Sequence, residues 1–507
     1  MSKSIIIIGA GIAGLSAGCY GQMNGYRTQV FELHDKPGGL CTAWKRKEYT
    51  FDGCIHWLVG SGAGSSFNRI WQELGATQGR QFVDHEEFVR VEGEGGKTFI
   101  VYTNIDRLEQ HMKELAPADA EVIEEFAGAL RRFTRFGDAM GQPGGSPSLL
   151  GAVKTAYRML PFMPLLRKYG KITVQDYVTR FSDPFLRHAF GAIFGLPGFP
   201  MMAVMMTLAW MHNRDAGYPI GGSLDFARGI ERRYLDLGGE IHYGARVEEI
   251  LVEADRAVGV RLAGGADDGR PREHRADIVI SAADGHATIF DMLAGRYADD
   301  KIRGYYEEWP IFQPIVQVSL GVARDLSAEP QMVSFPLEPP LTIAGEARER
   351  MGVRHFCDDP TMAPPGKSAV VVSFDSDYAY WQELHRERER YDAEKKDIAV
   401  KVIAQLEKRL PGIEDQVEVV DVATPITTER YTGNWQGSIE GWMITAETMG
   451  MMMGKGMDKT LPGLENFYMV GQWVEPGGGV PTAAGSGRRV IQMICKRDGK
   501  RFEARVP

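Results

Sequence analysis

The stretch that decides the fold reads IIIIGAGIAGLSAG at residues 5–18 and QVFEL at residues 29–33. Four consecutive isoleucines are typical of a short parallel strand that is buried on both faces. The small residues that follow the glycines predict a helix, and residues 29–33 predict a second strand. The segment therefore has the strand–helix–strand order of a dinucleotide-binding unit.

Each glycine of this unit, and the acid that follows, has a physical role in nucleotide binding. Gly9 permits a tight turn, Gly11 lets a diphosphate approach the backbone, and Gly14 lets the helix pack closely on the strand. The start of the helix offers N–H groups and the positive end of its dipole to the diphosphate. Glu32 follows the glycines by roughly 20 residues, the position from which an acid accepts hydrogen bonds from a ribose.

A second glycine pair indicates which dinucleotide is bound. Gly38, Gly39 and Leu40 come soon after Glu32, and the segment YTFDGCIHW follows at residues 49–57. This pair gives the backbone a second close approach, which suits the diphosphate and ribityl part of FAD. An enzyme that binds only NAD does not need it. The sequence therefore predicts a tightly held FAD.

Further motifs extend over most of the chain. They are YPIGGS at 218–223, ADIVISAAD at 276–284, TP at 424–425 with RYTG at 430–433, and the segment 468–488. With the N-terminal unit, they resemble the FAD-dependent amine-oxidase-like superfamily, in the branch that contains phytoene desaturases, carotenoid isomerases and retinol saturases. None of these motifs selects one substrate.

The fingerprint and the resemblance together imply a set of FAD contacts. These are Gly9, Ala10, Gly11, Ile12, Ala13, Gly14, Glu32, Leu33, Gly39, Leu40, His56, Trp57, Val247, Ala282, Gly471, Gln472, Gly479, Val480 and Pro481. In the resembled family, the backbone at the Val247 position faces the adenine, and the C-terminal helix points its positive end at the flavin.

The expected fold class is α/β. A discontinuous Rossmann-type FAD-binding domain is expected from residues 1–83, 218–295 and 431–507, and an α+β substrate domain from residues 84–217 and 296–430. We expect the first insertion to be helical, with a membrane-facing part, and the second insertion to contain strands.

Local patterns refine this division. Residues 316–322 and 369–374 predict strands of the second insertion, and 144–147 (GGSP) predicts a flexible join in the first. Near the C-terminus, 467–470 predicts a strand and 482–491 a helix.

Composition excludes several classes of protein. The chain has 507 residues and a net charge of −9, which argues against nucleic acid as a partner because a phosphate-binding surface needs clustered cations. Its five cysteines show no ligand spacing, so neither a metal site nor a disulfide framework is expected. No apolar run reaches the ~18 residues of a membrane span, and we expect no signal peptide, because the apolar run at residues 5–8 belongs to the first strand. These features predict a cytoplasmic location, with peripheral membrane attachment suggested by the next feature.

Apolar clusters point to a hydrophobic substrate. Residues 149–166 mix large apolar side chains with cations, a pattern that fits either a helix on a bilayer surface or a core-facing helix with a basic outer face. Methionines gather at 201–206 and 449–453. Methionine adapts well to irregular ligands, and it is also a common core filler. Together the clusters favour a long apolar tunnel over a polar pocket.

The sequence offers two candidates for catalysis. His56 lies in the loop that, by resemblance, approaches the flavin; it either transfers a proton or fixes the loop. Glu475 precedes the C-terminal glycine turn and is a candidate base. Two positions depart from the resembled family: Gln472 replaces a common acid, and Leu40 follows the glycine pair where many phytoene desaturases have Arg.

The leading hypothesis is an FAD-dependent enzyme that desaturates, saturates or isomerises C=C bonds of a polyene or isoprenoid, such as a carotenoid or retinoid. The alternatives are a fatty-acid double-bond isomerase and an FAD-holding lipid-binding protein without turnover. Any NAD(P)H or other electron donor or acceptor is expected to be diffusible, because FAD occupies the one fingerprint of this kind. The oligomeric state leaves no signal in the sequence.

Overall fold

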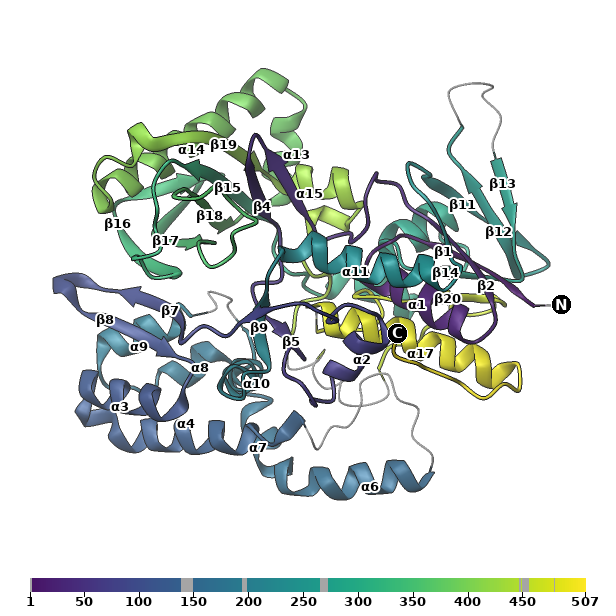
Figure 1. Cartoon of the computed structure of the whole chain (residues 1–507), viewed down its shortest axis with the longest axis horizontal. Helices are drawn as coiled ribbons and strands as arrows, with labels where there is room; N and C mark the ends of the chain where they lie inside the picture. Colours follow the sequence, from purple (N-terminus) through teal and green to yellow (C-terminus); the bar gives the residue numbers. More distant parts are fainter. Residues whose placement is uncertain are drawn as a thin grey trace.

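In its computed structural model the chain is described over residues 2–137, 149–193, 198–264, 272–445, 448, 456–477 and 479–507. Two sheets and a helical layer make up most of this structure (Figure 1). The expected join at 144–147 and the methionines at 449–453 lie outside the described residues.

A five-stranded parallel sheet collects strands from distant parts of the chain. In spatial order they are β10 (Glu240–His242), β2 (Arg27–Phe31), β1 (Ser4–Ile8), β14 (Ile278–Ser281) and β20 (Phe467–Met469). The predicted strands at 5–8 and 467–470 are confirmed. The strand predicted at 29–33 ends at Phe31 instead. Glu32 therefore follows directly after the carboxyl end of β2.

The isoleucines of β1 alternate between two cores. Ile5 and Ile7 are buried against helices α1 (Ile12–Met23), α11 (Gly222–Asp236) and α17 (Gly479–Arg497). Ile6 and Ile8 face the opposite side and pack against β11 (Val247–Glu253) and β12 (Arg256–Leu262), which pair with β13 (Arg272–Arg275). Both faces of β1 are therefore covered, which explains why it has no polar side chain after Ser4.

The second sheet has seven strands and draws on both predicted insertions. Its order is β19 (Val417–Ala423), β15 (Ile315–Val322), β18 (Ser368–Asp375), β17 (Glu346–His355), β16 (Met332–Ile343), β7 (Glu87–Glu92) and β8 (Thr98–Tyr102). The strands predicted at 316–322 and 369–374 are confirmed. The prediction that the first insertion is helical is wrong at β7 and β8, which complete this sheet through the parallel pairing of β7 with β16. Alternation in EFVRVE and TFIVY was the signal for these strands.

The helical layer packs below β7 and β8 in Figure 1. It consists of α3 (Ile105–Leu115), α4 (Ala120–Phe133), α6 (Leu149–Met159), α7 (Met163–Tyr169), α8 (Val174–Val178), α9 (Pro184–Gly191) and α10 (Met201–His212). Met201, Met202 and Met205 are fully buried in the core of this layer. These methionines therefore fill a core, which was one of the two readings of the cluster.

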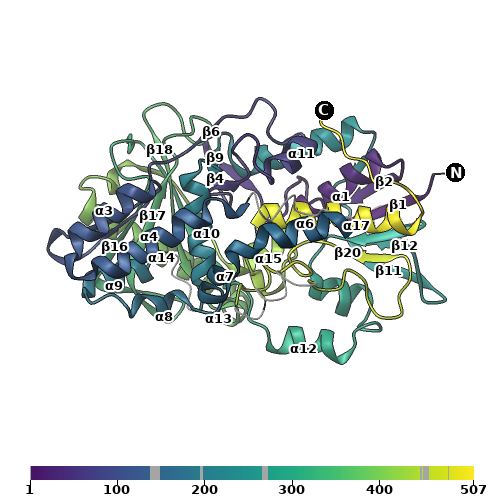
Figure 2. The same ribbon diagram turned by 90° about the horizontal axis from the view of Figure 1, so that it is seen from below.

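Smaller elements join the layers. They are β3 (Ala43–Arg46), β4 (Tyr49–Asp52), β5 (Leu58–Val59), α2 (Asn68–Glu73), β6 (Phe82–Val83), β9 (Ala216–Pro219), α12 (Asp300–Glu308), α13 (Tyr378–His385), α14 (Arg388–Arg409) and α15 (Pro425–Thr432). Turned by 90°, the molecule shows the five-stranded sheet with α1 and α17 at one end and the seven-stranded sheet at the other (Figure 2). β4 and β9 lie between them.

Candidate active site

The glycine fingerprint lies at the carboxyl end of the five-stranded sheet. Gly9 has a φ of +96°, and a Cβ there would lie 3.3 Å from the carbonyl oxygen of Ala282. A Cβ on Gly14 would lie 2.0 Å from the carbonyl oxygen of Gly9, so only glycine lets α1 start this close to β1. These contacts explain two of the three glycines as packing requirements of the turn.

Gly11 differs, because the space beside it is open. A Cβ there would meet only the carbonyl oxygen of Gly38, at 3.9 Å. The Gly38 N–H donates to the Ala10 carbonyl at 2.9 Å, and Gly11 and Gly38 form an isolated parallel bridge. Gly11 is also the N-cap of α1, with no side chain capping the helix. The two glycine loops thus form one backbone cradle that fits a diphosphate at a helix N-terminus.

Glu32 is held beside this cradle. Its Oε2 accepts a hydrogen bond from the Ala10 N–H at 2.6 Å, and its Oε1 accepts one from the His34 N–H at 2.9 Å. Burial raises the pKa of this carboxyl above its ordinary value, while the backbone donors oppose the shift. The Ala245 N–H donates to the Glu32 carbonyl at 2.8 Å, which brings the start of β11, at Val247, to the same edge. The neighbouring Leu33 is exposed.

The C-terminal helix meets the fingerprint directly. A Cβ on Gly487 would lie 2.5 Å from the carbonyl oxygen of Ala13, and the Ser16 hydroxyl donates to the Ala484 carbonyl at 2.7 Å. The helix predicted at 482–491 begins earlier, at Gly479, so Val480 and Pro481 lie in its first turn. The structure therefore brings the two glycine-rich segments together, although more than 450 residues separate them in the chain.

Gln472 has a defined partner in this region. Its Nε2 donates to the Asn434 side-chain oxygen at 3.0 Å, and the Trp473 indole N–H donates to the same oxygen at 3.1 Å. Gly471, just before it, has a φ of +100°, and a Cβ there would lie 3.5 Å from that of Ala13. The neutral amide is thus oriented next to the start of α1.

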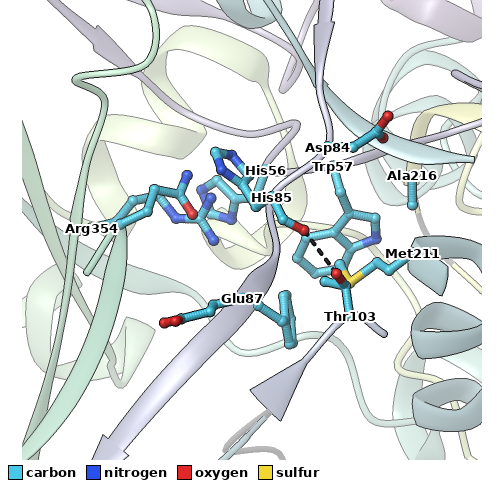
Figure 3. A pocket seen from close by; sticks show the side chains of 11 residues that line it. His56, Trp57, Asp84, His85, Glu87, Thr103, Met211, Ala216 and Arg354 are labelled. Atoms are coloured by element: carbon cyan, nitrogen blue, oxygen red, sulfur yellow. Dashed lines mark hydrogen bonds between the residues drawn. The ribbon is translucent and has the colours of Figure 1, made fainter. Parts of the chain in front are cut away.

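His56 and Trp57 line a small cavity beside the seven-stranded sheet, to which Glu87 of β7 and Arg354 of β17 also contribute (Figure 3). His85 and Arg354 belong to the same cavity, and the Thr103 hydroxyl donates to the His85 carbonyl at 2.9 Å. Burial lowers the pKa of His56 well below its ordinary value, and the charge of Arg354 lowers it further. His56 is therefore a neutral imidazole near pH 7, able to donate or accept a hydrogen bond but not to act as a cation.

Glu475 occupies a different environment. Its carboxylate lies 3.1 Å from the Lys459 ammonium and 3.5 Å from the Arg489 guanidinium. Burial lowers the pKa of Lys459, and the Glu475 carboxylate opposes that shift. Glu475 is therefore a shared counter-ion of two cations.

Several ionisable groups of this region escaped sequence reasoning. Burial raises the pKa of Asp52, Asp284 and Glu440 to about 7 in each case. Asp52 accepts hydrogen bonds from the Ser223 and Cys54 N–H groups at 2.8 and 3.2 Å, and so ties the start of α11 to the loop before His56. A single acidic residue in a sequence does not show whether folding will bury it. The one related signal in the sequence was the YPIGGS motif, which ends at Ser223.

Comparison with known proteins agrees with this geometry. The family model described as flavin containing amine oxidoreductase matches residues 12–494. Prolycopene isomerase of Arabidopsis thaliana is 26% identical, over 99% of this chain and 84% of that protein. Phytoene desaturase (lycopene-forming) of a Paracoccus species is 26% identical, over 97% of both chains. The structure of an oxidoreductase from Methanosarcina mazei shares the fold, with a TM-score of 0.60 at 19% identity, over 96% of this chain and all of that one.

The match extends over almost the whole chain and includes both glycine-rich segments. The protein is a mixed α/β enzyme, an oxidoreductase or isomerase whose cofactor is FAD, and it belongs to the family of flavin-containing amine oxidoreductases.

Proposed function

We propose that this enzyme desaturates, saturates or isomerises C=C bonds of a polyene or isoprenoid lipid. The observation that carries the proposal is the open cradle at Gly11, in a chain whose full-length relatives are named for acting on phytoene and prolycopene. FAD, when bound, supplies the capacity to accept or return a hydride or an electron pair. The protein supplies binding, orientation and the surroundings of the reacting carbon atoms.

The binding residues take the following roles in this proposal. Backbone N–H groups at Gly11–Gly14 bind the diphosphate, and Glu32 accepts hydrogen bonds from the ribose in place of its present backbone donors. The first turn of α17, at Gly479–Pro481, directs its positive helix end toward the flavin. Gln472 offers an amide to the ribityl chain.

The division of the chain follows from the same assignment. We assign 1–83, 218–295 and 431–507 to FAD binding, because these ranges supply all five strands of the parallel sheet. We assign 84–217 and 296–430 to the substrate, because these ranges supply the seven-stranded sheet. His56 lies where the two meet, so it is the better placed of the two catalytic candidates; Glu475 is better suited to holding its two cations.

An apolar stripe on α6 and the turn after it is proposed to contact a bilayer. Val153, Tyr157 and Leu160 are 67%, 76% and 60% exposed, and their spacing puts them on one side of the helix. Exposed cations, Lys154 and Arg158, flank them. Large apolar groups flanked by cations suit the boundary between anionic headgroups and acyl chains, and a polyene dissolved in the bilayer would be taken up there. No helix of the described residues is both long and apolar enough to cross a bilayer.

The test is a substrate panel with redox control. The purified yellow enzyme, oxidised or photoreduced under anaerobic conditions, is incubated with phytoene, prolycopene, retinol and linoleate, and the products are read by mass and ultraviolet spectrum. Loss of two mass units shows desaturation, a gain of two shows saturation, and an unchanged mass with a shifted spectrum shows isomerisation. If every substrate returns unchanged in both redox states, the chain is a binding protein and the proposed enzymatic function is wrong.

A further inference from the structure

A buried cation without a carboxylate partner lies in the cavity beside His56. Arg354 is the penultimate residue of β17 and is only 6% exposed. Among the described residues it forms no ion pair, and its guanidinium Nη2 contacts the Met332 sulfur at 3.1 Å. A thioether is a weak acceptor, so this contact replaces little of the hydration that the cation has lost.

The charge of Arg354 affects two histidines, His56 and His85, that line the same cavity. The charge of Arg354 lowers the pKa of both His56 and His85, although burial is the larger cause in each case. His85 has a pKa lowered to about 4, so both rings are neutral near pH 7. The buried Nε2 of His85 has no hydrogen-bond partner within the described part of the chain. The cavity wall thus presents one positive charge and an unsatisfied ring nitrogen.

Among the residues that the structure describes, no carboxylate that lines the cavity forms an ion pair with Arg354, although the charges of Tyr218 and Asp52, from outside the cavity, oppose the lowering of its pKa by burial. Glu87 lines the cavity, but its carboxylate is bound at both oxygens by Arg90, at 2.5 and 2.9 Å. Asp84 lies on the other side of Trp57 from Arg354 in Figure 3, and burial raises the pKa of its carboxyl. Asp358 lies 3.6 Å from Nδ1 of His85.

Cavity size and charge together select the class of ligand group. The cavity is small, with a volume of about 20 Å³, so it admits one small polar group. One guanidinium balances one negative charge, and its planar fork matches the two oxygens of a carboxylate. A diphosphate would bring more negative charge than the single guanidinium of Arg354 can balance.

We infer that the substrate carries a terminal carboxylate, which Arg354 binds in the cavity beside His56. The inference rests on the proposed function and narrows its substrate class to unsaturated acids, either polyene acids or fatty acids. Binding one end of a long chain at a fixed point also determines which double bond lies next to the cofactor. A carotenoid hydrocarbon has no group that would pair with Arg354.

The experiment compares each acid with its methyl ester, which has nearly the same shape and no charge. Dissociation constants of the FAD-loaded enzyme for retinoate, methyl retinoate, linoleate and methyl linoleate are read from the change in flavin absorbance. We expect at least one acid to bind ten times or more tightly than its ester, and the preferred acid separates the polyene from the fatty-acid class. Equal affinity of acid and ester for both chains overturns the inference.

Two variants assign the preference to this side chain. Arg354→Met keeps the volume and removes the charge, so the acid-to-ester preference falls to about one while ester binding changes less than twofold. Arg350→Met is the matched control on the same strand, because the Arg350 guanidinium donates to the Glu92 and Ser334 carbonyls instead of lining the cavity. It keeps the preference. If Arg354→Met retains the preference, the inference is wrong.

Other outcomes separate this inference from the function on which it rests. If Arg354→Met fails to fold, Arg354→Lys takes its place, because lysine keeps the charge but lacks the planar fork. This variant is expected to weaken the preference for the acid over its ester. An unchanged acid-to-ester preference contradicts the inference. If hydrocarbons are turned over and acids and esters bind alike, the inference fails and the proposed function stands. If no member of either panel binds or reacts, both fail.

Discussion

At the scale of single residues, the fingerprint glycines serve different purposes. Gly14 is required by packing, because its α-hydrogen already faces the carbonyl oxygen of Gly9. Gly11 is not required by any neighbouring atom of the protein closer than 3.9 Å. We therefore propose that the bound diphosphate, rather than the fold, limits the side chain at Gly11.

Alanine substitutions should separate these two roles. Gly14→Ala places its Cβ 2.0 Å from a backbone oxygen and should lower the free energy of unfolding of the apoprotein by about 1–3 kcal/mol or more. Gly11→Ala should leave the apoprotein within about 0.5 kcal/mol of wild type, because its φ of −66° suits alanine, yet weaken FAD binding by about tenfold or more. Chemical denaturation of apoprotein and FAD titration measure the two effects. Normal FAD affinity in Gly11→Ala would contradict the proposed cradle.

Asp52 predicts a pH dependence of stability. Its pKa is raised by burial to about 7, whereas in the unfolded chain it has the ordinary value near 3.9. Between these values the folded state keeps a proton that the unfolded state has lost, so stability falls as the pH rises through this window. Above pH 7 both states are ionised, and the loss is complete.

Asp52→Asn removes this titration. The amide also loses a hydrogen-bond acceptor for Ser223 or Cys54, which lowers stability by an amount that does not vary with pH. Relative to the variant, the wild type should therefore lose on the order of 3–4 kcal/mol of unfolding free energy from pH 4 to pH 7. Urea denaturation of both proteins across this range measures it. A difference that stays constant with pH would show that Asp52 is ionised throughout.

At the scale of elements, the contact between α1 and α17 determines whether the two glycine-rich segments share one site. Gly487 makes this contact possible, because a Cβ there would lie 2.5 Å from the Ala13 carbonyl oxygen and 2.7 Å from the Ala17 nitrogen. Both neighbours are backbone atoms, so the helices themselves must separate to admit a side chain.

Gly487→Ala should therefore reduce both stability and FAD retention, the first by about 1–3 kcal/mol. Gly128→Ala is the matched control: Gly128 also lies within a helix, α4, but nothing stands within 4 Å of its missing Cβ. That change should raise stability by about 0.5–1 kcal/mol and leave FAD unaffected. Thermal unfolding and flavin absorbance after gel filtration provide the measurements. Equal effects of the two substitutions would refute the close helix contact.

At the scale of the whole molecule, the proposed membrane contact of α6 defines the face on which a bilayer would lie. It is the lowest helix in Figure 1, and α14 lies on the opposite side of the molecule. The exposed apolar side chains of α6 form a stripe. On α14, by contrast, Val400 is the one large apolar side chain that is exposed among the described residues, at 65%.

Replacing Tyr157 and Leu160 by Ser should reduce flotation of the enzyme with anionic liposomes at least tenfold and leave its stability unchanged, because both side chains face solvent. Val400→Ser should float as the wild type does. Neutral liposomes should bind the wild type more weakly, since Lys154 and Arg158 then have no anionic partner. If the double variant floats as the wild type does, the proposed contact of α6 with the membrane is wrong.

The sequence by itself determined the nucleotide-binding unit, because that unit depends on contacts close in the chain: a β-branched strand, glycines whose backbone must turn or pack closely, and an acid about one strand further on. The same local logic predicted β15, β18, β20 and most of α17. It missed β7 and β8, although their residues alternate, and no local pattern showed that β7 pairs with β16, more than 200 residues away.

Only the tertiary structure decided what lies around the reacting end of the site. His56, His85 and Arg354 come from three segments with no periodic relation, and the cavity that they share forms only when the loop at His56 packs against the seven-stranded sheet. The same holds for the burial that raises the pKa of Asp52 and for the cations that surround Glu475. Charge and desolvation depend on distances through space, and a linear sequence carries no record of those distances until the chain has folded.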